Sequence, residues 1–259
     1  MDDNLYDKLR ELTGKIPEKF SILEEQIDVK LQMEYFKFSS RIKKSIPKDT
    51  PIVLEEIPDL YDEKISIEVI KESLVKLASI DDPKAYRLIE AYLKDGKPEL
   101  NHWTILAQQE SKMLLESTLL NENQVFISTG LGGKGNMLRY FIVFIGEEIS
   151  EFNDFQQNIL KSEFEFALKS NQSELEEITF NEHFATMVVL IPFDVPFQKI
   201  FREAIAECNN YGNFLKPNFL VTNVKKLSTK EISEFLENNE LPDSDSMDNL
   251  GIEPNDDEA

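Results

Sequence analysis

The second half of the chain alternates between strand-like and helix-like segments, in an order that constrains the fold more than any other feature of the sequence. Two runs rich in Val, Ile, Phe and Tyr, 137–145 and 184–191, are typical of buried strands. Residues 151–169 instead place Phe152, Phe155 and Phe164 on one side of a helix. From Met137 the order is β-α-β-β-α-β. The segments are 137–145, 151–169, 174–180, 184–191, 196–211 and 218–224.

This order predicts an antiparallel sheet with two helices on one face, the ferredoxin-like arrangement. A further strand-like segment, 124–128, precedes it and adds one extra strand. Ser228 and Glu231 have the spacing of a capping box and predict a short helix over 228–238. We therefore expect an α+β protein whose ferredoxin-like domain covers 122–227.

The first 120 residues carry apolar side chains at steps of three and four, which is typical of amphipathic helices. This spacing predicts N-terminal helices over 1–46, the longer of which begins near residue 17. Three prolines indicate a linker over 47–65. Helical hairpins are expected over 66–120, where Ser66 has the position of an N-cap.

Residues 77–89 read Leu-Ala-Ser-Ile-Asp-Asp-Pro-Lys-Ala-Tyr-Arg-Leu-Ile, and residues 103–107 read Trp-Thr-Ile-Leu-Ala. These two sequences, both within 66–120, resemble helical repeats of the HEAT type. Such repeats stack helix pairs and present a surface for protein partners, so the resemblance implies a protein-binding role. The alternative is an ordinary helical subdomain.

Two groups of side chains in the helical region allow a surface role as well as a structural one. The first is Arg41, Lys43 and Lys44, which suit the end of a helix or a docking patch for an acidic partner. The second is Phe36, Phe38 and Trp103, which suit packing or an exposed interface.

The charge of the chain limits its partners. Lys and Arg total 28 and Asp and Glu total 49, which gives a net charge of −21. Phosphate backbones need a positive surface, so the composition predicts no direct binding of nucleic acid. Residues 240–259 hold eight acids and no base, and predict a disordered acidic tail. The tail either keeps the protein soluble or attracts a basic partner through its negative charge.

A single cysteine, Cys208, excludes an intramolecular disulfide. Together with two histidines it is too few for a structural zinc site, so no metal site is predicted. Cys208 is in helical step with Phe201 and Ile205 and is expected to be a buried core thiol. The acidic start, without a secretory signal or a membrane-length apolar run, predicts a cytoplasmic protein that does not bind membranes.

The densest cluster of glycines joins the segments 124–128 and 137–145. Glycine lets backbone N–H groups approach an anion or another backbone, and nearby cations would add charge. The candidate contact residues are Gly130, Gly132, Gly133, Lys134, Gly135 and Arg139. The spacing is not that of a phosphate-binding P-loop, and no helix follows directly. A structural loop, a partner contact and an anion or nucleotide site all remain open.

No catalytic arrangement is recognisable. His102 and His183 lie far apart and neither is near a nucleophile motif. We therefore predict no catalytic residue and no cofactor. The favoured function is an acidic protein-binding module, such as an adaptor, regulator or assembly factor, whose protein partner is basic. The alternative is a small-molecule, anion or nucleotide-binding protein that uses the segment 130–135, and a smaller possibility is association with ribosomes through their basic proteins.

Overall fold

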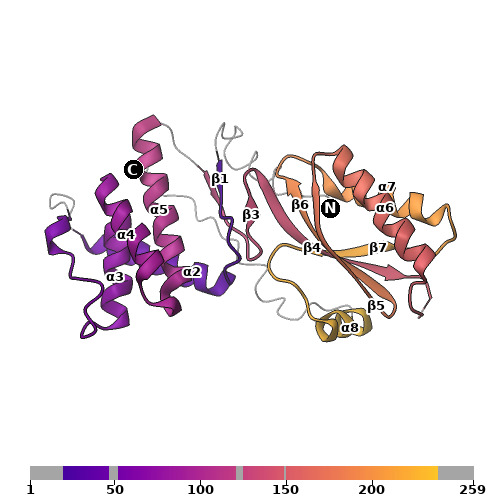
Figure 1. Ribbon diagram of the computed structural model, residues 1–259, viewed down its shortest axis with the longest axis horizontal. Coiled ribbons are helices and arrows are strands. Elements are labelled where there is room, and N and C mark those ends of the chain that lie inside the picture. Colours follow the sequence, from indigo (N-terminus) through magenta and orange to yellow (C-terminus); the bar gives the residue numbers. More distant parts are fainter. Residues whose placement is uncertain (1–19, 47–51, 121–124, 149, 239–259) are drawn as a thin grey trace, which may run out of the picture.

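The computed structural model describes residues 20–46, 52–120, 125–148 and 150–238. In Figure 1 a group of helices lies beside a sheet that carries helices of its own. Each of these two parts has its own cluster of buried hydrophobic side chains. The helix expected near the N-terminus and the acidic tail expected at 240–259 lie outside the described residues.

Within the described residues, the helical part consists of four α-helices and two short 3-10 helices. They are α2 (Val29–Ser45), η1 (Leu54–Glu56), α3 (Ile67–Ala78), α4 (Pro83–Asp95), η2 (Pro98–Leu100) and α5 (Asn101–Leu120). Trp103 is buried and packs edge-on against Tyr35 and Phe38, at ring-centroid distances of 5.0 and 5.3 Å. It is therefore a core residue, whereas Phe36 is 37% exposed. The resemblance to HEAT-type hairpins stays a prediction.

Short polar side chains fix where these helices begin. The Asp28 carboxylate accepts from the N–H groups of the first turn of α2, with 2.8 Å to the Lys30 nitrogen. Ser66 caps α3, as the sequence predicts, by accepting from Val69 N–H. Asp82 caps α4, whose first residue is proline. Each cap satisfies a donor that the helix itself leaves free.

The prediction of a long helix from residue 17 is wrong at its start. Residues Phe20–Ile22 form a strand, β1, and the helix begins only at Val29. β1 pairs in parallel with β2 (Val125–Ile127) in a separate two-stranded sheet. The strand expected at 124–128 therefore exists but does not join the larger sheet. Long-range pairing satisfies the backbone of β1 and overrides the local helical spacing.

The larger sheet is antiparallel throughout and has the order β3-β4-β6-β5, with β7 paired to β4. From β4 onward its strands and helices follow the order expected from the sequence, whereas β3 lies in the segment expected as a loop. The elements are β3 (Gly133–Lys134), β4 (Met137–Gly146), α6 (Asp154–Ser170), β5 (Glu174–Asn181), β6 (Phe184–Pro192), α7 (Phe197–Asn209) and β7 (Leu215–Thr222). The α+β class with N-terminal helices is confirmed. The finer ferredoxin-like assignment and the domain limits stay predictions.

The two faces of this sheet are covered by different helices (Figure 1). Successive side chains of a strand point to opposite faces, and β4 follows this rule. Phe144 packs with Phe164 of α6 and Phe201 of α7, at ring-centroid distances of 4.4 and 6.1 Å. Phe141 and its neighbours on the other face join a second cluster with the C-terminal helix. β4 thus contributes side chains to the hydrophobic core on each face of the sheet.

The C-terminal helix, α8 (Thr229–Asn238), begins with the predicted capping box. The Glu231 carboxylate accepts from Ser228 N–H at 2.8 Å, and Glu231 N–H donates to the Ser228 hydroxyl at 3.3 Å. Lys225 lies 2.7 Å from the same carboxylate. The hydrogen bond from Lys225 is the largest cause that lowers the pKa of Glu231 to about 2.

The low pKa of Glu231 makes the contribution of this residue to stability pH-dependent. Above about pH 4.5, its ordinary pKa, the charged carboxylate stabilises the folded state, and this contribution is lost as the pH falls toward 2. We predict that Glu231→Gln lowers the free energy of unfolding at pH 7 and that the difference from wild type vanishes near pH 2. Urea unfolding at several pH values measures this. Glu234→Gln, which removes an exposed ion pair within α8, is the matched control; an equal pH-dependent loss there would contradict the prediction.

Candidate functional site

The glycine-rich segment predicted as a contact site forms a tight hairpin. Gly133 of β3 pairs with Leu138 of β4, and Lys134 pairs with Met137. The connection is therefore only two residues long. Gly135 lies in it with a φ of 60°, where glycine is favoured. Strand pairing replaces the long, soft loop that the sequence suggests.

Two of the four glycines lie against the backbone of another segment. A Cβ at Gly130 would overlap the carbonyl group of Val224. A Cβ at Gly132 would overlap the carbonyl oxygen of Glu24, and the φ of Gly132 is 67°. A Cβ at Gly133 would overlap the Met137 carbonyl oxygen within the hairpin and the Ile22 side chain, while Gly135 faces open space. The absence of side chains therefore lets the hairpin pack against other parts of the same chain.

The N–H groups of this segment donate to protein acceptors. Leu131 N–H donates to the Asn223 carbonyl at 2.9 Å. Gly133 N–H donates to the Glu24 carbonyl at 3.3 Å, and Gly135 N–H donates to the Glu24 carboxylate at 2.9 Å. The segment thus holds the stretch after β1 and the stretch after β7 on either side of the hairpin.

The two cations of the predicted site are paired with acids of β5. Lys134 lies 2.9 Å from Glu174. Arg139 donates to both carboxylate oxygens of Glu176, at 2.5 and 3.0 Å, and to the Leu131 carbonyl at 2.8 Å. The hydrogen bond from Arg139 is the main cause that lowers the pKa of Glu176. The fold therefore gathers all six predicted residues around one hairpin, and their role as a ligand or partner contact stays a prediction.

The histidines and the cysteine lie in separate environments. His102 is exposed at the start of α5, whereas His183 lies in the turn between β5 and β6. The buried Nδ1 of His183 has no hydrogen-bond partner within the described residues. Cys208 is fully buried in the core, as expected, and burial raises the pKa of its thiol to about 12. None of the three is placed to act with another.

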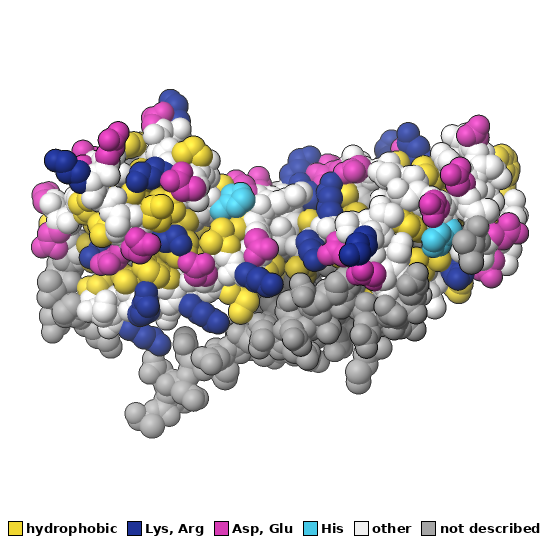
Figure 2. All heavy atoms as spheres, turned by 90° about the horizontal axis from the view of Figure 1, so that it is seen from below, with side chains coloured by type: hydrophobic (Ala, Val, Ile, Leu, Met, Phe, Trp, Pro, Cys, Tyr) yellow, Lys and Arg dark blue, Asp and Glu magenta, His cyan; other side chains and the backbone are white. Residues whose placement is uncertain are grey.

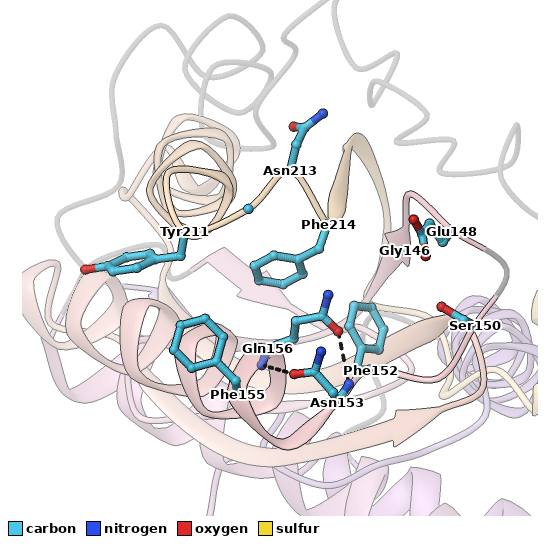
Figure 3. Close-up of a pocket in the computed structure, with 11 residues that line it drawn as sticks. Gly146, Glu148, Ser150, Phe152, Asn153, Phe155, Gln156, Tyr211, Asn213 and Phe214 are labelled. Atoms are coloured by element: carbon cyan, nitrogen blue, oxygen red, sulfur yellow. Dashed lines mark hydrogen bonds between the residues drawn. The ribbon is translucent and has the colours of Figure 1, made fainter.

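A pocket that the sequence analysis missed lies beyond the far end of β4, between the start of α6 and the turn after α7. Its volume is about 290 Å³, near the lower end of ordinary ligand pockets. Figure 3 shows the side chains that surround it. The lining residues are Gly146, Glu148, Ser150, Phe152, Asn153, Phe155, Gln156, Tyr211, Gly212, Asn213 and Phe214.

Two aromatic rings at this pocket are unusually exposed. Phe155 is 61% exposed and Tyr211 is 58% exposed, whereas Phe152 and Phe214 are buried. In Figure 3 the rings of Phe155, Tyr211 and Phe214 lie around one end of the pocket. Helical spacing predicts that Phe155 lies on the packed side of its helix, and this prediction is wrong. Its position in the first turn of α6, before the helix meets the core, keeps it in solvent.

The polar groups of the pocket are mainly amides. Asn153 and Gln156 form the capping box of α6 through their side-chain oxygens, each at 3.0 Å from a backbone nitrogen. Their amide nitrogens have no partner among the described residues, and Figure 3 shows that of Gln156 directed toward the Phe214 ring. Glu148 is the single charged side chain in the lining, which contains no Lys or Arg. The pocket therefore suits a planar, uncharged group with hydrogen-bonding edges.

The described part of the chain also bears on metal binding and membrane crossing. It contains no group of three or more His, Cys, Asp or Glu side chains that could hold a metal ion. No helix there combines the length and the apolar character needed to cross a membrane.

Comparison with known proteins gives structural likenesses alone. No protein-family model matches the sequence, and no curated protein matches it. A candidate transposase from Deinococcus radiodurans R1 is similar over 42% of this chain and 96% of its own, with 15% identity and a TM-score of 0.35. A REP-associated tyrosine transposase bound to a REP hairpin is similar over 38% of this chain and 62% of its own, with 13% identity and a TM-score of 0.30.

These likenesses correct the predicted function. The expectation of a protein-binding adaptor that makes no direct contact with nucleic acid is wrong by this comparison. Both of the similar solved structures described above are transposases, and one of them is bound to a REP hairpin. TM-scores of 0.35 and 0.30 are too low to transfer the activity of either protein to this chain.

The packing of the glycine hairpin gives a matched pair of substitutions. Gly135→Ala adds a Cβ in open space at positive φ, and we expect it to lower the free energy of unfolding by about 1 kcal/mol. Gly132→Ala adds the same strain and also a clash with the Glu24 backbone, so we expect a loss of roughly 3 kcal/mol. Urea unfolding of both variants measures this. Equal losses would show that the close approach at Gly132 does not stabilise the fold.

Proposed function

We propose that this protein binds nucleic acid by taking an unpaired base into the pocket between α6 and α7. The observation that carries the proposal is the pair of exposed rings, Phe155 and Tyr211, at the edge of an amide-lined pocket. Large aromatic side chains are normally buried, so two exposed at one pocket suggest a surface that meets a ligand.

Stacking explains why aromatic rings would be placed there. Single-stranded recognition relies on unstacked bases that lie against Phe, Tyr or Trp rings. Such stacking is worth about 1–3 kcal/mol per base and tolerates any sequence, because every base has a π-face. Phe155 lies in the first turn of α6 and Tyr211 lies just after α7, so each brings an exposed ring to the pocket from a different segment.

The amides supply contacts to the edge of a base. The free amide nitrogens of Asn153 and Gln156 are donors that suit ring nitrogens and carbonyl groups. The Glu148 carboxylate is an acceptor that suits an exocyclic amine. The site therefore favours bases that carry both kinds of group.

The charge of the protein restricts the mode of binding. In Figure 2 acidic side chains are spread over both parts of the molecule, and the net charge is −21. No basic side chain lines the pocket, so contacts with phosphates contribute little here. The proposal is thus confined to a base in a loop or a single strand, bound with a shallow dependence on salt. We also propose a cytoplasmic location, which the sequence predicts.

Fluorescence anisotropy with a labelled DNA hairpin that has an unpaired loop tests this function, with a blunt fully paired duplex of the same stem as a reference. We expect the hairpin to bind more tightly than the duplex. Phe155→Ala and Tyr211→Ala should each weaken hairpin binding by roughly 5- to 150-fold, because each removes a stacking surface.

The control variant is Phe166→Ala. Phe166 is 72% exposed on the same helix but does not line the pocket, so its loss should leave binding unchanged. Three results would contradict the proposal: no preference for the hairpin, equal weakening by Phe166→Ala, or a steep fall of affinity with salt.

A further inference from the structure

The second half of α5 carries apolar side chains without a core to bury them. The buried residues of this helix end at Ser111. Beyond it Met113 and Leu114 are half-buried, and Leu119 is 82% exposed. A helix usually ends its apolar face where its packing partners end. This part of α5 therefore offers an apolar surface that the rest of the described chain leaves open.

This surface forms one wall of a groove between α5 and α2. Phe36 of α2 and Phe126 of β2 lie opposite, with their ring centroids 6.1 Å apart. The groove has a volume of about 410 Å³, and a second hollow of about 550 Å³ adjoins it through Phe36, Lys43 and Glu110. The apolar lining of the groove is Phe36, Leu106, Met113, Leu114 and Phe126.

A polar cluster separates the apolar groove from the second hollow. The Glu110 carboxylate accepts from the Tyr35 hydroxyl at 2.5 Å, from the Ser39 hydroxyl at 2.8 Å and from Lys43 at 2.6 Å. Burial, followed by the nearby charge of Glu110, raises the pKa of Tyr35 well above its usual value, so Tyr35 remains a neutral donor. Glu110 therefore has its acceptors occupied, and it holds the Lys43 ammonium at the end of the groove.

The side chains at this end of the groove carry a net positive charge, which is opposite in sign to the net charge of the whole protein. Lys43 lines both hollows and Lys44 lines the second. The Lys43 side chain is 44% exposed, and Lys44 has no ion-pair partner within the described residues. Since Glu110 balances the charge of Lys43, the unpaired Lys44 leaves a net positive charge beside the apolar groove, which is complementary to an amphiphile with an anionic head.

We infer that this groove binds a free, medium-chain fatty acid. Its aliphatic chain lies along Met113, Leu114 and Phe126, and its carboxylate meets the ammonium groups of Lys43 and Lys44. The tail gains by leaving water, and the head gains a charge-assisted contact. This site lies in the helical part and is independent of the base-binding pocket between α6 and α7.

Isothermal titration calorimetry with octanoate, decanoate and dodecanoate, each below its micelle concentration, tests the inference on the full chain. Each pair of added methylenes should strengthen binding by about 15-fold until the groove is filled, since one buried methylene is worth about fourfold. Decyltrimethylammonium, with a chain of the same length and a cationic head, should bind at least tenfold more weakly than decanoate.

Two variants locate the site without disturbing the Glu110 cluster. Lys44→Gln should weaken decanoate binding several-fold, while Lys37→Gln, an exposed lysine of α2 outside both hollows, should not change it. Leu114→Glu, at a half-buried position, should abolish binding and leave the circular dichroism spectrum unchanged. The methyl signal of Met113 in ¹³C-methionine NMR should shift with decanoate.

Several results would contradict the fatty-acid site. Affinity that does not depend on chain length, equal binding of the cationic amphiphile, or an unchanged affinity of Lys44→Gln would each overturn the inference. So would binding to vesicles of phosphatidylglycerol without binding to monomeric decanoate, because the ligand would then be a membrane surface.

Discussion

The close contact between the glycine hairpin and the stretch after β1 is the constraint on which the arrangement of this protein depends. Gly132 lies so near the Glu24 backbone that no side chain fits between them, and the Gly133 N–H donates to the Glu24 carbonyl at 3.3 Å. The buried amide of Gln32 reinforces the junction by donating to the Ile27 and Thr129 carbonyls, at 2.7 and 3.1 Å. Backbone and amide hydrogen bonds have strict geometry, so this junction sets how the stretch after β1 and the start of α2 lie against the glycine hairpin.

β4 connects this junction to the pocket. It begins at the glycine hairpin and ends at Gly146 in the pocket lining, and its ten residues span roughly 33 Å. The side chains of β4 belong to the cores on both faces of the sheet. The two candidate sites consequently lie in different parts of the molecule, each beside a packed core. Their ligand preferences also differ, since one lining lacks Lys and Arg while the other ends at two lysines.

Local patterns predicted much of this fold. The order of elements after Met137, the cap at Ser66 and the capping box at Ser228 rest on neighbouring residues, and the structure confirms them. β1 could not be predicted locally because its three residues become a strand only through pairing with β2, far away in the sequence. The pocket could not be predicted because it too is formed by residues that are distant in the sequence. Its aromatic residues come from two separate segments, and in sequence Phe155 looks like any other phenylalanine of an amphipathic helix.

The parallel pairing of β1 with β2 has a consequence for the architecture of the chain. Phe20 lies beside Val125, so the chain leaves the neighbourhood of the sheet and returns to the same place after completing α2 to α5. Parallel strands cannot be joined by a tight turn, so the helical part is the crossover connection between β1 and β2. Closing so long a loop costs conformational entropy before the strands can pair. The two-stranded sheet is therefore expected to form late in folding, after the helices between its strands have packed.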